Sequence, residues 1–413
     1  MTCRINPAPE ALRPRAPLPE SLSWREGSLQ RLQSEGLMRP HRVRRGRQGR
    51  LVELDGRELV NFGANDYLGY AGDVRLTRSC SKGSCAEGFG SGASPLVSGH
   101  SQAHEALESA LANLLQTEAA IVFPSGFAAN AATIPALVGE GDLIVSDERN
   151  HASIIDGCRL TRARLLVYPH RDLRTLVSQV EAALPARRLL IVTDSLFSMD
   201  GTVAPLADLC DIADRFGGML MVDEAHATGV FGDRGSGLLE ATGCAARVSI
   251  RVGTLSKALG TAGGFVAGPQ PLIHWLRHAA RAWIFSTAHP PGVAAAATTA
   301  ITLLEQEPFR RRELLEKARQ FRAELTALKA LPIASGQPKS TPEVSSHIVP
   351  VVVGTPEKAV TLSHRLAEAG FFVPAIRPPS VPRDGSLVRV SLSWHHTDDD
   401  LSRLASAISA ELS

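Results

Sequence analysis

Short hydrophobic runs, separated by helical or loop segments, recur along the middle of the 413-residue chain. Each run is nearly continuous instead of alternating with polar residues, which is typical of strands buried on both faces. Strands of this kind that alternate with helices predict an α/β fold, with a largely parallel sheet covered by helices. The predicted strands are residues 119–123, 143–145, 165–168, 189–193, 219–222, 248–252 and 265–267.

The two ends of the chain follow other patterns. Apolar residues at roughly helical spacing predict a docking helix over residues 21–37, and two runs around Asp55-Gly56 predict a hairpin over 51–62. Residues 88–99 are rich in glycine and predict an irregular loop, while Ser101 is a plausible N-cap of the helix that follows.

After residue 308 the pattern changes to a smaller α+β region, with strands near 347–353 and 387–394 and helices near 357–368 and 398–412. We therefore expect an N-terminal extension, helix and hairpin over 1–62, a large α/β domain over 63–308 and a small α+β domain over 309–413.

Composition excludes several classes of protein. The chain is 44% hydrophobic and 21% charged with a net charge of +2, so no strong field favours nucleic acid or a membrane surface. The proline-rich first 20 residues have no apolar signal segment and are expected to be poorly ordered, and no run reaches the ~18 apolar residues of a membrane span. We expect a cytoplasmic protein with reduced cysteines and no metal, because Cys80 and Cys85 lack a second ligand pair.

The stretch 252–260 contains the strongest candidate nucleophile, Lys257. It follows the predicted strand 248–252 and lies among small residues, which allow a large group to approach closely. Partial burial penalises an ammonium ion, so such an amine can form a Schiff base. The alternative is a solvated surface lysine, the usual state of this residue.

Polar residues also follow other predicted strands. Asp223 comes directly after 219–222, where a carboxylate needs a cationic partner such as a protonated pyridine nitrogen. His226 can donate to a phenolic oxygen on the same ring, and His151 can stack on a flat cofactor. The alternatives are an N-capping aspartate and two incidental histidines.

Residues 124–130, PSGFAAN, follow the strand 119–123 and precede a helical stretch. Free N–H groups at a helix N-terminus beside a glycine form a phosphate cradle, although a plain strand-to-helix turn has the same pattern. Together with the lysine, the carboxylate and the two histidines, this segment describes a site for pyridoxal phosphate.

The chain resembles the α-oxoamine synthases, a fold-type I pyridoxal phosphate family, from about residue 22 to the C-terminus. The resemblance lies in residues 65–69 (NDYLG), 125–130 (SGFAAN), 151–153 (HAS), 197–201 (FSMDG), 223–226 (DEAH) and 254–260 (TLSKALG). It implies a seven-stranded, largely parallel sheet with a smaller C-terminal α+β domain, and a homodimer.

The resemblance also implies roles for single residues. Lys257 would form the imine with the cofactor and take the substrate proton, with Asp223 at the ring nitrogen and His151 stacked on the ring. Others implied at the cofactor are His226 at the ring oxygen, Gly126, Phe127 and Thr254 at the phosphate, and Ser198 nearby. The residues implied at the substrate are Arg39, His151, Arg377 and Ser380.

Residues 375–382, AIRPPSVP, resemble the pattern of the family member that joins alanine to a pimeloyl thioester in biotin synthesis. L-Alanine and pimeloyl-CoA, or a pimeloyl carrier protein, are therefore the expected substrates. Two alternatives stay open: a sister activity, such as glycine C-acetyltransferase or 5-aminolevulinate synthase, and a non-catalytic pyridoxal phosphate-binding module. The arginines between 39 and 50 fit either a solvated connector or a contact for anionic substrate groups.

Overall fold

The computed structural model of the chain describes residues 20–330 and 345–412. The chain divides into two compact units, with the boundary between Arg42 and Val43. In the first unit a short 3₁₀ turn, η1 (Glu20–Leu22), precedes α1 (Trp24–Ser34), so a helix within the predicted range is confirmed, while its docking stays a prediction. The expectation of poor order before residue 20 lies outside the described residues.

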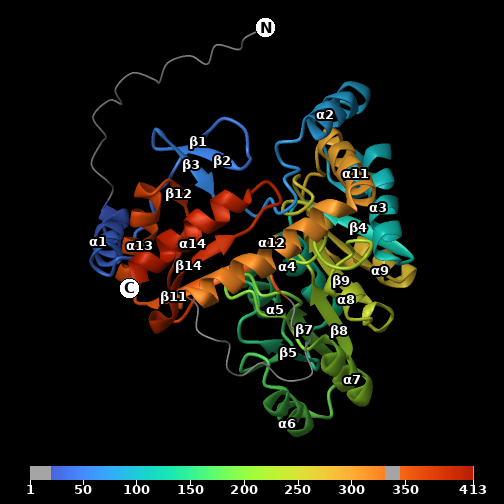
Figure 1. Ribbon diagram of the computed structural model, residues 1–413. Helices are drawn as coiled ribbons and strands as arrows, with labels where there is room; N and C mark the ends of the chain where they lie inside the picture. Colours follow the sequence, from blue (N-terminus) through green and yellow to red (C-terminus); the bar gives the residue numbers. More distant parts are fainter. Residues whose placement is uncertain (1–19, 331–344, 413) are drawn as a thin grey trace. The chain divides into compact units, whose positions relative to one another are not determined.

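The second unit is built on a seven-stranded sheet with the strand order β4-β10-β9-β8-β7-β5-β6. Figure 1 labels β4, β9, β8, β7 and β5 of this sheet. β10 runs in the opposite direction to the other strands of this sheet, which are parallel to one another, so the prediction of a largely parallel sheet is confirmed. The strands are β4 (Ala119–Phe123), β5 (Leu143–Asp147), β6 (Arg164–Tyr168), β7 (Leu189–Asp194), β8 (Met219–Asp223), β9 (Ile250–Thr254) and β10 (Gly264–Gly268).

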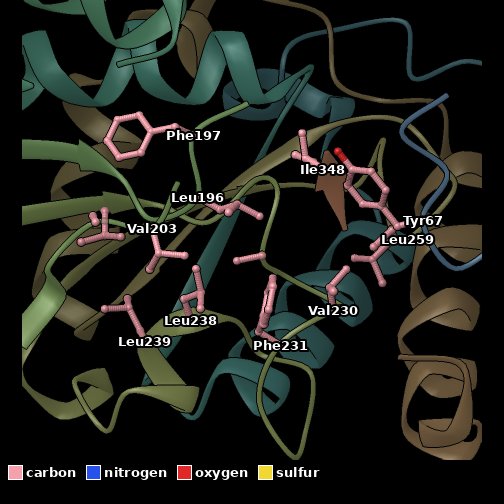
Figure 2. Packing of buried hydrophobic residues seen from close by; sticks show 14 of the residues in the cluster. Tyr67, Leu196, Phe197, Val203, Val230, Phe231, Leu238, Leu239, Leu259 and Ile348 are labelled. Carbon is pink, nitrogen blue, oxygen red and sulfur yellow. The ribbon is translucent and has the colours of Figure 1, made fainter. Parts of the chain in front are cut away.

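Both faces of this sheet are buried, as the continuous apolar runs indicate. Successive residues of β7 alternate between two hydrophobic cores: Leu190 and Val192 belong to one, Leu189 and Ile191 to the other. A strand with a period of two serves both cores only if every position is apolar. Figure 2 shows part of the larger core, where Tyr67 lies beside Ile348.

Helices cover the two faces. They are α2 (Val74–Glu87), α3 (Gln102–Leu115), α4 (Gly126–Leu137), α5 (Ala152–Arg159), α6 (Leu173–Ala183), α7 (Leu206–Phe216), α8 (Leu238–Ala241), α9 (Gln270–Ala279), α10 (Arg281–Phe285), α11 (Pro291–Gln306) and α12 (Pro308–Ala327). One local prediction is wrong: the loop at 88–99 contains a helical turn, Pro95–Gly99, because the Ser94 carbonyl accepts the N–H groups of Val97 and Gly99.

The C-terminal part contains β11 (Ile348–Gly354), α13 (Pro356–Glu368), β12 (Phe371–Phe372), β13 (Ala375–Ile376), β14 (Ser386–Ser391) and α14 (Asp398–Leu412). The order β11-β14-β13 forms an antiparallel sheet, as expected of an α+β region.

The predicted hairpin is confirmed as β2 (Leu51–Leu54) and β3 (Arg57–Asn61), whose turn residues Asp55 and Gly56 both have positive φ. β1 (Arg44–Arg45) extends it on one side, and β12 pairs with β3 on the other. The hairpin thus shares a sheet with the C-terminal segment. The predicted boundaries at residues 62 and 308 stay predictions. Across residues 20–330 and 345–412, no helix is long and apolar enough to span a membrane.

Candidate active site

The polar candidates lie at one edge of the seven-stranded sheet. β5, β7, β8 and β9 run parallel, so their carboxyl ends lie along one edge. β4 runs in the same direction, because β10 is antiparallel to both β4 and β9. Asp223 is the last residue of β8, and the other candidates lie within four residues of a strand end: Gly126, His151, Ser198, His226 and Lys257.

Asp223 is the buried carboxylate at the centre of this edge. Its Oδ1 accepts the Ala225 N–H at 2.8 Å, and its Oδ2 accepts an Asn130 Nδ2–H at 2.6 Å. These bonds come from the segment after β8 and from α4, so both carboxylate oxygens are held by fixed donors. Such donors stabilise the ionised form that a pyridinium nitrogen requires.

His151 is the N-cap of α5, and part of the residue is open to solvent in the single chain. Its Nδ1 accepts the Ser153 N–H at 3.3 Å and lies 2.7 Å from the Ser153 hydroxyl. Its backbone N–H donates to Asp194 Oδ2 at 2.7 Å. Burial lowers the pKa of His151, and the negative charge of Asp223 offsets only part of this shift. The ring is therefore held neutral in a fixed orientation, as stacking requires.

Lys257 is half-buried in the turn after β9. Burial lowers the pKa of its amine to about 8, although the charges of Asp223 and Asp194 oppose this shift. An amine with this pKa is neutral far more often at physiological pH than an ordinary lysine, so it is a competent nucleophile. The pKa of Asp194 is raised, because Asp194 is buried and faces the charge of Asp223.

His226 is buried and is held by a tyrosine. Its Nδ1 lies 2.6 Å from the Tyr67 hydroxyl, which comes from the NDYLG segment before α2. Burial raises the pKa of Tyr67 and lowers that of His226, so both groups are neutral. The single Tyr67 hydroxyl hydrogen has two acceptors in reach, His226 Nδ1 and Asn65 Oδ1 at 3.1 Å. Donation to Nδ1 leaves the Nε2–H of His226 as a donor, which is the role predicted for it.

The predicted phosphate residues meet at the N-terminus of α4. The Ser125 hydroxyl accepts the Ala128 N–H at 3.0 Å, and among the described residues no acceptor is assigned to the N–H groups of Gly126 and Phe127. Thr254 lies against this end, since a Cβ at Gly126 would come within 3.2 Å of the Thr254 Cβ. Free N–H groups, a glycine and a hydroxyl here suit an anion.

Sequence reasoning missed Arg389, in the middle of β14. The side chain is only 7% exposed, and its guanidinium donates to the Ser198 carbonyl at 3.1 Å, to Ser391 Oγ at 2.9 Å and to Asn65 Oδ1. Within residues 20–330 and 345–412 no carboxylate forms an ion pair with it. Its charge lowers the pKa of Lys257, which places it within electrostatic range of that amine.

A signal for Arg389 was present in the sequence. It is a charged residue inside an otherwise apolar strand pattern, LVRVSL. A buried arginine without an acidic partner is costly, so it indicates a site for an anion.

The remaining predicted substrate residues are Arg377, Ser380 and Arg39. Arg377 is half-buried and Ser380 is exposed in the turn after β13, where the Ser380 N–H donates to the Arg377 carbonyl at 3.1 Å. Arg39 lies in the first unit. A substrate role for these three residues stays a prediction. In the described part of the chain, no group of three His, Cys, Asp or Glu side chains is arranged to hold a metal ion.

Comparison with known proteins agrees with this geometry. The family profile of aminotransferase class I and II matches residues 57–408. The chain is 45% identical to an 8-amino-7-oxononanoate synthase of Symbiobacterium thermophilum, covering 92% of this chain and 95% of the relative. It is 44% identical to one of Geobacter sulfurreducens, covering 92% and 96%.

Two solved structures are similar in fold. One is a serine palmitoyltransferase from S. paucimobilis with pyridoxal phosphate and myriocin bound, with a TM-score of 0.86 and 30% identity over 95% of this chain and 97% of that one. The other is the 8-amino-7-oxononanoate synthase from Francisella tularensis, with a TM-score of 0.72 and 28% identity over 86% and 98%. The fold is therefore the fold-type I architecture, and the chain belongs to the aminotransferase class I and II family, among its 8-amino-7-oxononanoate synthases.

Proposed function

We propose that this chain is a pyridoxal phosphate-dependent acyltransferase. It would condense L-alanine with a pimeloyl thioester, giving 8-amino-7-oxononanoate, carbon dioxide and free thiol in biotin synthesis. The observation that carries the proposal is the grouping of Lys257, Asp223, His151 and Arg389 around one sheet edge. The names of the relatives support the choice of product.

The residues present fit pyridoxal phosphate. Asp223 would hold the ring nitrogen, His226 the ring oxygen and His151 one face of the ring. The free N–H groups of Gly126 and Phe127, with Thr254, would hold the phosphate, and Ser198 would lie nearby. When bound, the cofactor links to amines and withdraws electrons from the carbon next to the nitrogen.

Lys257 would serve as the attachment point and as the base that takes the alanine Cα proton. Its pKa of about 8 suits both tasks, because the amine gains and releases a proton near neutral pH. Arg389 would hold the alanine carboxylate, since its charge lacks an acidic partner among the described residues and its fork matches a carboxylate. Arg39, Arg377 and Ser380 are proposed to contact the acyl substrate.

We further propose a homodimer in the cytoplasm. The dimer follows from the family resemblance, and the cytoplasm from the cysteines, which are free throughout the described residues. Phe127, beside the proposed phosphate cradle, is 46% exposed in the single chain.

The test is product formation by purified protein loaded with cofactor. L-Alanine and pimeloyl-CoA should give 8-amino-7-oxononanoate by mass spectrometry, with thiol release and loss of the alanine carboxyl as carbon dioxide in equal amounts. Lys257→Ala should abolish turnover and the cofactor–lysine absorbance. Product only from glycine with another acyl-CoA would assign a sister activity. Cofactor binding without exchange of the alanine Cα proton would identify a non-catalytic module.

A further inference from the structure

A chain of hydrogen bonds joins Asp223, which would contact the nitrogen of the cofactor ring, to His151, which would stack on its face. Asn130, in α4, is 1% exposed and donates both of its Nδ2 hydrogens. One goes to Asp223 Oδ2 at 2.6 Å and the other to Ser153 Oγ at 2.9 Å. Ser153 Oγ in turn lies 2.7 Å from His151 Nδ1. The chain therefore runs from β8 through α4 and α5 to the stacking histidine.

The direction of every hydrogen bond in this chain is fixed. The Asp223 carboxylate only accepts, so it orients the Asn130 amide with Nδ2 toward it. His151 Nδ1 also receives the backbone N–H of Ser153, at 3.3 Å, so this nitrogen carries a lone pair. The Ser153 hydroxyl must then donate to Nδ1 while it accepts from Asn130. A neutral His151 therefore carries its proton on Nε2.

We propose that Asn130 and Ser153 are positioning residues that act as one relay, fixing the tautomer and orientation of His151 according to the carboxylate of Asp223. The inference rests on the proposed function, because it assumes that His151 and Asp223 contact the same cofactor ring. It adds two residues for which the motif resemblance gave no role. Asn130 and Ser153 would touch neither substrate nor cofactor.

The arrangement suits a control of ring orientation better than one of helix packing. α4 and α5 already pack together where Ile134 lies against Gly157, and Ile134 and Ile154 are buried in the same hydrophobic core. Asn130 Oδ1 is buried without a partner, so the amide is held only through its two donors. The charged groups around His151 are Asp223 from β8, Lys257 after β9, and Asp194 of β7 through the His151 backbone.

The test compares Ser153→Ala, Asn130→Ala and the double variant with a matched control, Thr133→Val. Thr133 lies in α4, is fully buried, and has a hydroxyl without a partner among the described residues. In apoprotein labelled with 15N-histidine, the His151 signal is assigned by its loss in His151→Asn. The wild type and Thr133→Val should show only the tautomer with the proton on Nε2. Ser153→Ala should also show some of the other tautomer, because only the longer backbone N–H bond at 3.3 Å then holds Nδ1.

Pyridoxal phosphate affinity of the apoprotein provides the second measurement. Each single variant removes two of the relay's three hydrogen bonds, and we expect binding to weaken about tenfold in either one. The double variant should lose no more cofactor affinity than the weaker-binding single variant, because either substitution alone already interrupts the relay. Additive losses, an equal loss in Thr133→Val, or an unchanged tautomer in Ser153→Ala would each overturn the relay. The tautomer measurement uses no substrate, so its result can be told apart from failure of the proposed reaction.

Discussion

The role proposed for Arg389 gives the sharpest test of the substrate site. Arg389→Met removes the guanidinium and keeps an apolar side chain of similar length within β14. Truncating one partner of a buried, hydrogen-bonded charge pair costs about 2–5 kcal/mol. At about 1.4 kcal/mol for each factor of ten, kcat/KM for L-alanine should fall roughly 30- to 4,000-fold. Arg389→Lys keeps the charge but loses the planar fork, so we expect an intermediate loss.

The expected loss must be separated from damage to the fold, because Arg389 also donates to Ser198, Ser391 and Asn65. Binding of L-alanine and of L-alaninamide to the cofactor-loaded protein is therefore compared by the change in cofactor absorbance. The wild type should prefer alanine, whereas Arg389→Met should bind the two alike.

Pyridoxal phosphate affinity serves as the control for a general distortion of the site. If Arg389→Met keeps the wild-type preference for alanine over alaninamide, Arg389 does not bind the carboxylate. The same conclusion holds if kcat/KM for alanine changes less than threefold in a variant that folds and binds cofactor.

Three further predictions concern groups at the sheet edge. Lys257→Met should raise the unfolding temperature of the apoprotein near pH 7, because it removes a half-buried ammonium that costs about 1–2 kcal/mol after solvent screening. The wild type should gain stability as pH rises from 8 toward 10.5, because the folded state loses this proton first. Equal stability of both proteins would contradict the burial of this amine. Asp223→Asn removes the charge and turns an amide toward Asn130, so pyridoxal phosphate affinity should fall about 10- to 100-fold in fluorescence titrations. An unchanged affinity would show that Asp223 does not contact the ring nitrogen. Burial raises the pKa of Glu224 to about 7, so the folded protein binds an extra proton between pH 4.5 and 7. Its stability should therefore fall by about 3 kcal/mol as pH rises across that range. In denaturant unfolding, Glu224→Gln should lack this dependence on pH, and a dependence that persists would place its origin in another group.

The sequence by itself determined the sheet and most of the residues around its edge. The runs at 119–123, 189–193 and 219–222 predict strands because every position of a doubly buried strand must be apolar. Asp223 and Lys257 directly follow such runs, so their place at the carboxyl edge of a parallel sheet is a local consequence of the chain.

The tertiary structure decided what no local pattern specifies. Arg389 reaches Ser198 and Asn65 across 191 and 324 residues of sequence, so its place at the site depends on how the C-terminal sheet packs against the large one. The pairing of β12 with β3, which joins the N-terminal hairpin to the C-terminal region, is equally distant. Asn130 bonds to Asp223 only because the fold brings together α4 and the end of β8, although the two residues are 93 positions apart in the sequence. Burial, hydrogen-bond partners and shifted pKa values depend on such long-range contacts, and one-dimensional patterns carry no information about them.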